Sequence, residues 1–444
     1  MSFPKFKAVF AMIGLACGLT AALIWHWYQG EIQKRGYPFD TFLFLSHVRF
    51  TDFYDTVAGS SNWNPYSRLA VYLPFTYVVL HPFSWVAAFP AYMLYLAITL
   101  VLLFRSIFLI LATSLGQTRF TALSAATLLG CSFPFIFCID RGNIELTVMW
   151  LICECVYCMH CRSYARGLAY LVPAICMKVY PAVLLAMLLP RRRWKLLSVS
   201  LVAATAITIA SMSLFTGSLA DNARQWRLQA SQFTTNYVIG NAGMGGTASV
   251  WNAAKIVAIQ QQLYDVNHDA SHAVNDFDAY LSGLLRWYTI GLVITSVYLT
   301  FHVVVVETSF WRRVSLLILF MVLATPAGAE YKVVHAITSL VCLIVTKERR
   351  AGDLCVVALI TLALMPKKYF YFPFIVTDSG VADCSIAVLV NPMLLCGAAF
   401  VLGAGAWSYT TAGRRRARLA AFLRGLLCGN RNRSALRPAV VGLG

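Results

Sequence analysis

Runs of about 20 apolar residues recur along almost the whole chain, and each is long enough to cross a hydrocarbon core of about 30 Å. The 444 residues are 59% hydrophobic and only 12% charged, whereas a soluble protein carries about 25% charged residues. The sequence therefore predicts an all-α, polytopic integral membrane protein, and it excludes a soluble globular fold.

The apolar segments and the polar stretches between them suggest one large membrane domain. We expect about 10–12 membrane segments, with long polar loops at about 29–70 and 218–285. The transmembrane domain would cover residues 1–412, and residues 413–444 would form a basic tail. The apolar segments lie at about 8–28, 71–88, 90–115, 121–139, 144–161, 167–177, 181–190, 196–216, 286–306, 314–327, 333–346, 352–366 and 385–409.

Basic residues give the chain a formal net charge of +18, and they gather at the ends of apolar runs, as at 191–195 and 414–418. Lys and Arg collect in the cytoplasmic loops of membrane proteins. We therefore expect both termini in the cytoplasm and both long loops on the extracytoplasmic face. No stripe of basic residues interleaves with aromatic residues, which argues against nucleic acid as a partner.

The stretch 162–195 is too short for the number of membrane crossings that the charges at its two ends require. Arg162 and Arg191 both indicate cytoplasmic ends, but the apolar residues between them suffice for about one crossing. Two prolines interrupt the stretch, and Lys178 lies between them. A broken or re-entrant helix with Lys178 near its tip resolves the conflict, because irregular backbone at membrane depth is tolerated where protein or water surrounds it. The alternative is that one arginine cluster lies outside.

Two acidic residues follow the first apolar run. Asp52 and Asp55 are three positions apart, so on a helix they share one side and could face one cavity. A carboxylate at the mouth of a low-dielectric cavity is suited to act as a general base. The alternative is the solvated polar face of a juxtamembrane helix, and the pattern alone does not separate the two.

Polar residues interrupt the apolar runs at three later places. A lysine within such a run is rare and indicates a functional site, so Lys178, beside Tyr180, is a candidate for holding a phosphate as a point charge. The other two places are PAGAEYKVVH, with Glu330, Tyr331, Lys332 and His335, and CIDRGNIE, with Asp140, Arg141, Asn143 and Glu145. Glu330 and Lys332 could instead neutralise each other, and an Asp–Arg pair at a helix boundary is often structural.

Two further groups superficially resemble metal sites. The spacing of Cys153, Cys155, Cys158 and Cys161, with His160, spreads the thiols around a helix, and buried cysteine packs as a small hydrophobe. His268 and His272, among Asp265, Asp269, Asp276 and Asp278, lack the glutamate of an HExxH site and lie in a polar loop. A divalent metal is not indicated, and without a nucleotide-binding loop neither is a soluble cofactor.

Several short motifs follow one another along the first half of the chain. The first are Asp52-Phe53, Asn64-Pro65-Tyr66 and Tyr72-Leu73-Pro74-Phe75, and the later ones are Arg141-Gly142-Asn143-Ile144, Lys178-Val179-Tyr180-Pro181 and Arg193-Trp194-Lys195. Together they resemble glycosyltransferase family 87, a family of polyprenol-phosphate-dependent, GT-C-type enzymes that includes bacterial α-mannosyltransferases, although Phe75 replaces the family's second proline. Their order and spacing agree over roughly residues 5–200. Beyond that, the resemblance rests on Pro326 and the turn at Glu330-Tyr331-Lys332.

The resemblance implies a multi-pass enzyme of the bacterial cytoplasmic membrane. Such an enzyme would transfer a sugar, mannose or arabinose, from a polyprenyl-phosphate donor to a lipid or glycan acceptor at the extracytoplasmic face. Asp52 would be the catalytic base, with Asp55 orienting the acceptor or Asp52 itself, and in-line displacement would invert the anomeric centre. Candidates for binding the donor phosphate are Lys178, Tyr180, Lys332, His335 and Arg141. Candidates for binding the acceptor or the sugar are Asn143, Glu330, Tyr331 and Tyr66.

Two other functions fit part of the pattern. A polymerase or ligase of lipid-linked glycans would also act at the outer face, although we would then expect its key arginines and histidines in one long loop. A transporter or flippase of an anionic lipid would also need Lys178, but transporters commonly contain internal repeats, and none is visible in this sequence.

Overall fold

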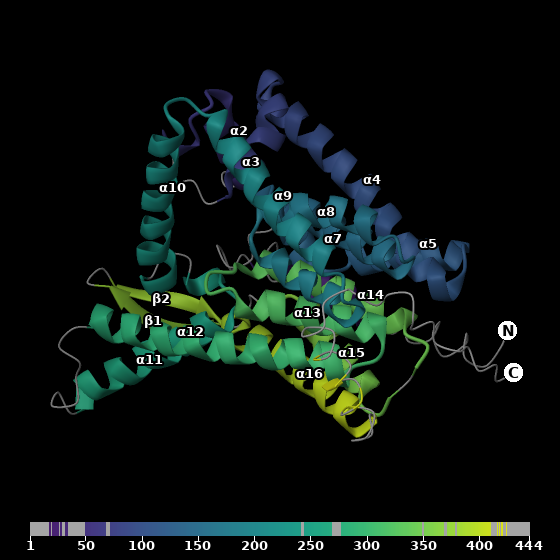
Figure 1. The fold of residues 1–444 in the computed structure, drawn as a ribbon. Helices are drawn as coiled ribbons and strands as arrows, with labels where there is room; N and C mark the ends of the chain where they lie inside the picture. Colours follow the sequence, from purple (N-terminus) through teal and green to yellow (C-terminus); the bar gives the residue numbers. More distant parts are fainter. Residues whose placement is uncertain are drawn as a thin grey trace, which may run out of the picture.

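The computed structural model describes residues 49–67, 72–240, 244–268, 277–348, 350–367, 371–377 and 380–409, with scattered positions between 17 and 33 and between 415 and 423. Over these residues the chain is almost entirely helical (Figure 1). The predicted all-α membrane fold is confirmed. Most of the first span predicted at 8–28, most of the loop before residue 49 and most of the basic tail lie outside the described residues.

The N-terminal part of the fold consists of helices of very different lengths. Its elements are α2 (Thr51–Ser61), η3 (Pro65–Ser67), α3 (Pro74–Leu80), η4 (His81–Trp85), α4 (Ala88–Leu115), α5 (Arg119–Gly130), α6 (Phe133–Arg141), α7 (Glu145–His160), α8 (Tyr164–Met177), η5 (Tyr180–Arg191) and α9 (Trp194–Ser213).

The C-terminal part adds one small hairpin to the helices. Its elements are α10 (Leu219–Phe233), η6 (Thr234–Ile239), η7 (Met244–Gly246), α11 (Val250–His268), α12 (Phe277–Phe301), η9 (His302–Val306), α13 (Phe310–Ala324), η10 (Glu330–Val334), α14 (His335–Val345), α15 (Asp353–Leu364), β1 (Tyr371–Thr377), β2 (Gly380–Ser385) and α16 (Ala387–Tyr409). The antiparallel pair β1–β2 was not predicted. The polar stretch 218–285 contains helices rather than an irregular loop.

Among the described residues, four helical segments are long and apolar enough to cross a bilayer: α4, α9, the continuous segment Ala279–Val306, and α16. Helices α5 and α6 together form a fifth candidate, bent by 63° at the break between them. Pro134 lies in the first turn of α6, where proline is tolerated, although it cannot continue a helix. Full-length crossings are therefore fewer than the predicted segments, because several apolar runs form helices of only 10–17 residues.

The predicted break at Lys178 is confirmed. Helix α8 ends at Met177, and Lys178 is extended, with φ −145° and ψ 128°. The 3₁₀ helix η5 then begins, with Pro181 in its first turn, where the missing N–H of proline loses no helical hydrogen bond. The break leaves the Lys178 side chain at the junction of two helices.

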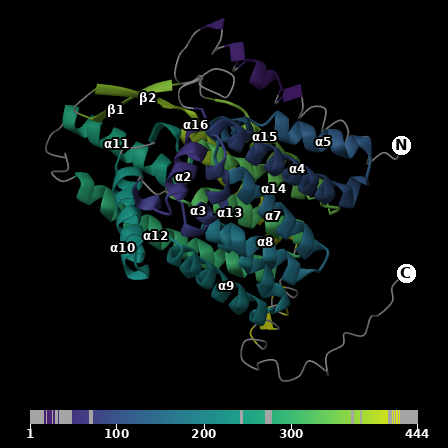
Figure 2. The ribbon, with the colours of Figure 1, turned by 90° about the horizontal axis from the view of Figure 1, so that it is seen from above.

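The helices lie in two sets, which Figure 1 shows one above the other. The upper set contains α4, α5, α7, α8 and α9, the lower set contains α11 to α16, and α10 descends beside them toward the hairpin. Seen from above, the upper helices overlie α13 and α14 (Figure 2). Helix α7 packs against α4, α8 and α14 and is buried almost all round, as expected for a helix that is apolar on every side. The first residue of α7, Glu145, therefore lies inside the protein.

Candidate active site

The turn between α6 and α7 brings α2 close to two polar side chains. Gly142 caps α6 with a φ of +66°. A Cβ there would lie 2.9 Å from Phe53 Cβ and 3.0 Å from Phe50 Cα, so only glycine allows α2 to approach this closely. The N–H of Phe50 donates to the Asp140 carbonyl at 2.7 Å and fixes the start of α2. Asp52 thereby faces the turn.

Both carboxylate oxygens of Asp52 are engaged at this turn. Arg141 Nη2 lies 2.7 Å from Asp52 Oδ1, and Asn143 Nδ2 lies 2.6 Å from Asp52 Oδ2. The Asp52 side chain is still 17% exposed and that of Arg141 is 30% exposed. Because each carboxylate oxygen has two acceptor positions, Asp52 can accept a further hydrogen bond from a bound molecule.

Asn143 connects Asp52 to a second, deeper group of polar residues. Its Nδ2 also lies 3.1 Å from Tyr72 Oη, and its Oδ1 accepts the Glu145 N–H at 3.1 Å. Lys178 Nζ lies 4.5 Å from the centre of the Tyr72 ring, within the range of a cation–π contact. One short loop thus orients Asp52 and starts the helix that carries Glu145.

Glu145 is the centre of the deeper group. Its carboxylate lies 3.3 Å from Lys178 Nζ and 2.8 Å from His335 Nε2, and it accepts a hydrogen bond from Tyr180 Oη. The Glu145 side chain is only 2% exposed. Its place in the first turn of α7 favours negative charge, because helix N-termini carry a partial positive charge. Three segments that are far apart in the sequence therefore share one buried carboxylate.

Lys332 is a buried cation that no carboxylate neutralises at contact distance. It is 2% exposed, it donates to the hydroxyl of Thr325, and its Nζ lies 3.8 Å from the centre of the Tyr180 ring. Among the described residues, no Asp or Glu forms an ion pair with it. An unpaired buried charge costs free energy, so this position suits an anionic ligand.

The groups joined by these contacts carry a surplus of positive charge. Arg141, Lys178 and Lys332 are basic, while Asp52 and Glu145 are acidic. The group has one net positive charge when these five residues are all ionised and His335 is neutral. Such a cluster can hold an anion, and its most exposed carboxylate can accept a proton. We call Asp52, Tyr72, Arg141, Asn143, Glu145, Lys178, Tyr180, Lys332 and His335 the polar network.

Seven residues predicted from sequence belong to the polar network: Asp52, Arg141, Asn143, Lys178, Tyr180, Lys332 and His335. The sequence assigned no role to its other two members, Tyr72 and Glu145. Glu145 was named only as part of the stretch CIDRGNIE, although an acidic residue at the start of an apolar run is expensive and indicates function. Tyr72 had no signal beyond its place in a family motif.

Four predicted site residues are not members of the polar network. Asp55 is exposed on α2, because only Asp52 faces the turn after α6, so the two acids do not share the polar network. Glu330 is buried and accepts a hydrogen bond from Asn391 Nδ2 at 3.3 Å, on the side of α16. Tyr331 lies beside the polar network, where its phenol interacts electrostatically with Asp52, Glu145 and Arg141. Its ring centre is 5.9 Å from that of Phe137.

Tyr66, the fourth of these residues, lies in η3 with its ring 5.9 Å from that of Phe215. Burial raises the pKa of Tyr66 to about 12, so the phenol stays protonated and can act as a hydrogen-bond donor. Among the described residues its Oη has no hydrogen-bond partner.

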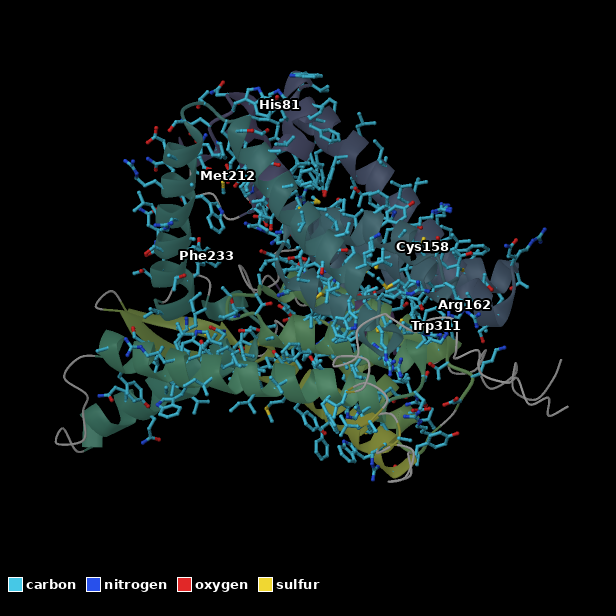
Figure 3. The ribbon with its side chains drawn as sticks, in the orientation of Figure 1. His81, Cys158, Arg162, Met212, Phe233 and Trp311 are labelled. Carbon is cyan, nitrogen blue, oxygen red and sulfur yellow. The ribbon has the colours of Figure 1, made fainter. Side chains whose placement is uncertain are left out.

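The cysteine group is far from the end of α2. Cys153, Cys155 and Cys158 are buried in α7, and Cys161 is exposed. Figure 3 shows Cys158 with Arg162 and Trp311 at the end of the molecule away from His81, and His81 Nδ1 lies 2.9 Å from the Ser60 carbonyl in α2. Within the described residues, no three His, Cys, Asp or Glu side chains are placed to bind a metal ion. The His268–Asp278 patch lies outside the side chains that the structure describes.

A family model for glycosyltransferase family 87 matches residues 70–326, which is more than half of the chain. No curated protein and no solved structure matches. The matched range contains Tyr72, Arg141, Asn143, Glu145, Lys178 and Tyr180 of the polar network, whereas Asp52, Lys332 and His335 lie on either side of it.

Proposed function

This chain belongs to glycosyltransferase family 87, and we propose that it transfers a sugar from a polyprenyl-phosphate donor to a hydroxyl group of a lipid or glycan acceptor. Family membership in a group of glycosyltransferases disfavours transport as the function. Mannose and arabinose are the sugars that we propose for the donor.

The observation that carries this proposal is the position of a partly exposed carboxylate on the same network of contacts as two lysines, of which Lys332 is buried. Asp52 connects through Asn143 and Tyr72 to Lys178. Lys332 contacts the Tyr180 ring and has no acidic partner among the described residues. Sugar transfer from a lipid phosphate needs these two elements, a base for the acceptor and positive charge for the leaving group.

In this proposal Asp52 takes the proton of the acceptor hydroxyl as the acceptor oxygen attacks the anomeric carbon. The bond between that carbon and the donor phosphate breaks, and the phosphate leaves with the electron pair. Arg141 and Asn143 hold the carboxylate in a fixed orientation, which lowers the cost of reaching a reactive geometry. In-line attack by the acceptor oxygen, with Asp52 as the single base, inverts the anomeric centre.

The departing polyprenyl phosphate gains negative charge in this step. Lys332, Lys178 and Arg141 are the cations that we propose to stabilise it, and Tyr180 and His335 are further contacts. Fixed charges in a site with little water are often the largest contribution to catalysis. Glu145 would act by holding Lys178, Tyr180 and His335 in place rather than by contacting the substrate.

The reaction face is also part of the proposal. With positive residues inside, the start of α2 would face the extracytoplasmic side of a bacterial cytoplasmic membrane, where the acceptor arrives. Asp55 is exposed on the same helix, and we propose that it contacts the acceptor rather than the donor phosphate. Glu330, Tyr331 and Tyr66 remain candidates for sugar or acceptor contacts.

The test uses the full chain in nanodiscs with radiolabelled polyprenyl-phosphate mannose, polyprenyl-phosphate arabinose and a lipid extract from the source organism. We expect the wild type to transfer label from one donor. Asp52→Asn should lower the transfer rate by about 10²–10⁴-fold, the usual contribution of a general base, while donor binding persists. Asp221→Asn is the matched control, since Asp221 is an exposed acid at the start of α10.

Two results would contradict the proposal. If the wild type moves no label from any polyprenyl-phosphate donor but uses another activated sugar, the donor class is wrong. If Asp52→Asn retains the rate of Asp221→Asn, Asp52 is not the base.

A further inference from the structure

Two tyrosine side chains, Tyr72 and Tyr331, lie near the carboxylate of Asp52. Tyr72 precedes α3 and Tyr331 lies in η10, so they come from distant parts of the sequence. The phenol of Tyr72 interacts electrostatically with Asp52, Tyr331 and Glu145. The phenol of Tyr331 interacts in the same way with Asp52, Glu145 and Arg141. Both hydroxyls therefore border the region between the proposed base and the deeper group of polar residues around Glu145.

The hydrogen of the Tyr72 hydroxyl is left without an acceptor by the hydrogen bonds of Asn143. Asn143 Oδ1 accepts the N–H of Glu145 at 3.1 Å, which identifies Nδ2 as the atom that faces Asp52 and Tyr72. Nδ2 carries two hydrogens, and it lies 2.6 Å from Asp52 Oδ2 and 3.1 Å from Tyr72 Oη. Tyr72 Oη therefore accepts from Asn143, and its own hydrogen has no acceptor among the described residues.

The Tyr331 hydroxyl forms no hydrogen bond within the part of the chain that the structure describes. The side chain is half-buried, and its oxygen keeps accessible surface. The rest of the residue is held in place, because the Tyr331 carbonyl accepts the Cys138 thiol at 3.4 Å and the ring lies 5.9 Å from that of Phe137. The hydroxyl is therefore available to a bound molecule.

Free hydroxyl hydrogens at this place suit an uncharged ligand with oxygen acceptors. A phenol is protonated at neutral pH, because its usual pKa is about 10, so each tyrosine offers one neutral donor. Lys178, whose Nζ lies 4.5 Å from the centre of the Tyr72 ring, and buried Lys332 already provide positive charge for a phosphate. A hydrogen-bond donor that stays unpaired costs free energy, and the oxygens of a sugar are acceptors that carry no charge.

We propose that the hydroxyls of Tyr72 and Tyr331 bind the sugar that is transferred, each by donating a hydrogen bond to one sugar oxygen. The inference rests on the proposed function, since it concerns the donor of that reaction. It goes beyond that function because it gives the enzyme a means to select the sugar: a site built to hydrogen-bond a substrate hydroxyl rejects an analogue that lacks it.

The order of groups along the polar network supports a sugar at this place. In an in-line displacement the anomeric carbon lies between the attacking oxygen, held by Asp52, and the departing phosphate, held by the lysines. Tyr72 spans the same interval, because its Oη contacts Asn143, the neighbour of Asp52, and its ring contacts Lys178. A hydroxyl at Tyr72 therefore faces the part of the substrate between the base and the phosphate.

The experiment measures equilibrium binding of three lipids to the full chain in nanodiscs: polyprenyl-phosphate mannose, polyprenyl-phosphate arabinose and polyprenyl phosphate without a sugar. Tyr72→Phe and Tyr331→Phe remove one hydroxyl each and keep the ring. Tyr331→Phe breaks no hydrogen bond among the described residues. It therefore decides the outcome if Tyr72→Phe, which leaves Asn143 with an unpaired hydrogen, folds poorly.

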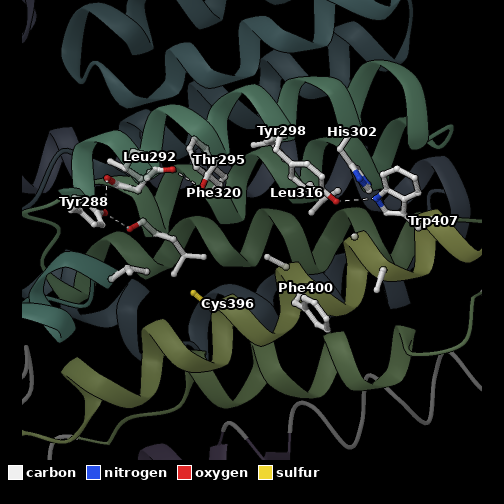
Figure 4. Close-up of a pocket in the computed structure, with 18 of the residues that line it drawn as sticks. Tyr288, Leu292, Thr295, Tyr298, His302, Leu316, Phe320, Cys396, Phe400 and Trp407 are labelled. Atoms are coloured by element: carbon white, nitrogen blue, oxygen red, sulfur yellow. Dashed lines mark hydrogen bonds between the residues drawn. The ribbon is translucent and has the colours of Figure 1, made fainter. Parts of the chain in front are cut away.

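Tyr288→Phe is the matched control. Tyr288 lines an apolar cavity of about 870 Å³ between α12, α13 and α16 (Figure 4), and no member of the polar network lines this cavity. The Tyr288 hydroxyl donates to the Ala324 carbonyl at 3.1 Å, so its removal costs a hydrogen bond within the protein. We expect Tyr288→Phe to be less stable than the wild type and to bind all three lipids as the wild type does.

We expect Tyr72→Phe and Tyr331→Phe each to weaken binding of the preferred sugar lipid by about 2–10-fold, the scale of one hydrogen bond, and to leave binding of polyprenyl phosphate unchanged. The proposal is overturned if both variants bind all three lipids like Tyr288→Phe, or if binding of polyprenyl phosphate weakens equally. It is also overturned if the variants keep donor binding and instead raise the KM of the acceptor.

Failure of the proposed function gives a different result. A wild type that binds a sugar lipid through both hydroxyls but transfers no label would keep this sugar site and refute the transfer. If Asp52 is not the base, Asp52→Asn keeps its transfer rate, while the effect of Tyr331→Phe on sugar binding persists.

Discussion

His335 Nε2 lies 2.8 Å from Glu145 Oε2, although 190 residues separate the two in the sequence. The contact joins the start of α14 to the start of α7, and Lys178 completes it from the break between α8 and η5. Three helix ends therefore meet at one buried carboxylate. The consequence is that Glu145 supports both the fold and the orientation of the groups that we propose to bind phosphate.

Replacing Glu145 by Ala should destabilise the protein strongly. Removing one partner of a buried ion pair typically costs about 3–5 kcal/mol, because Lys178 and the Tyr180 hydroxyl lose their acceptor while they remain buried. The measurement is the unfolding midpoint in detergent, together with sugar transfer per folded molecule.

Glu154→Gln is the control for this variant. Glu154 is a second buried acid on α7, paired with Arg105 at the far end of the helix from Glu145. We expect Glu154→Gln to lower stability and leave transfer per folded molecule near the wild-type value. Equal losses of transfer in the two variants would mean that Glu145 has no special part in the site.

Replacing Lys332 by Met should lower the transfer activity without lowering the stability of the protein. Met removes a buried charge that has no acidic partner at contact distance among the described residues, so the unfolding midpoint should stay constant or rise. Transfer should fall by about 10²-fold, the scale found when one group that stabilises the transition state is lost. The measurements are kcat and KM for the polyprenyl-phosphate donor. Lys195→Met, at an exposed lysine of α9, should change neither.

Replacing Gly142 by Ala should separate α2 from the turn that holds Asp52. The new Cβ would lie 2.9 Å from Phe53 Cβ, and the residue would also have to keep a φ of +66°. The left-handed conformation alone costs about 1–2 kcal/mol for a non-glycine residue, and the close contact adds to this. Gly130→Ala should be neutral or slightly stabilising, because its Cβ meets nothing within 4 Å. Unfolding midpoints of the two variants test the prediction, and equal midpoints would contradict it.

Lys255 lies outside the candidate membrane spans, and we expect it to make the stability of the protein depend on pH. Burial lowers the pKa of Lys255 from 10.5 to about 8, although its ammonium donates to the Gly240 carbonyl at 2.8 Å. Between about pH 8 and 10.5 the unfolded chain binds more protons at this residue than the folded chain, so this group makes stability rise with pH. Below pH 8 the lysine is charged in both states and contributes no slope.

The measurement compares the wild type with Lys255→Met from pH 7 to pH 10.5. Other groups titrate equally in both proteins, so the difference in unfolding free energy isolates Lys255. We expect the unfolding free energy of the wild type to increase relative to that of Lys255→Met as pH rises above about 8. A difference that stays constant over this range would contradict the lowered pKa.

The sequence by itself determined the class of fold and most members of the site. Apolar runs fix where helices form in a membrane protein, because backbone groups in the bilayer must be satisfied locally. For the same reason a charged residue that interrupts such runs is conspicuous, so Arg141, Lys178 and Lys332 could each be predicted from its local surroundings. Asp52 lies in the polar stretch 29–70 and was predicted instead from its spacing to Asp55 and from the family motif. The break at Lys178 also followed from length, charge and proline alone.

Only the tertiary structure decided which of these residues meet. Asp55 resembles Asp52 in sequence but is exposed, and Glu330 bonds to Asn391 rather than to Lys332. Glu145, absent from the predicted site residues, became the centre of the network because α7 packs between α4, α8 and α14. Hydropathy is a property of consecutive residues, whereas the partner of a buried charge depends on how helices distant in the sequence pack, and no local pattern contains that information.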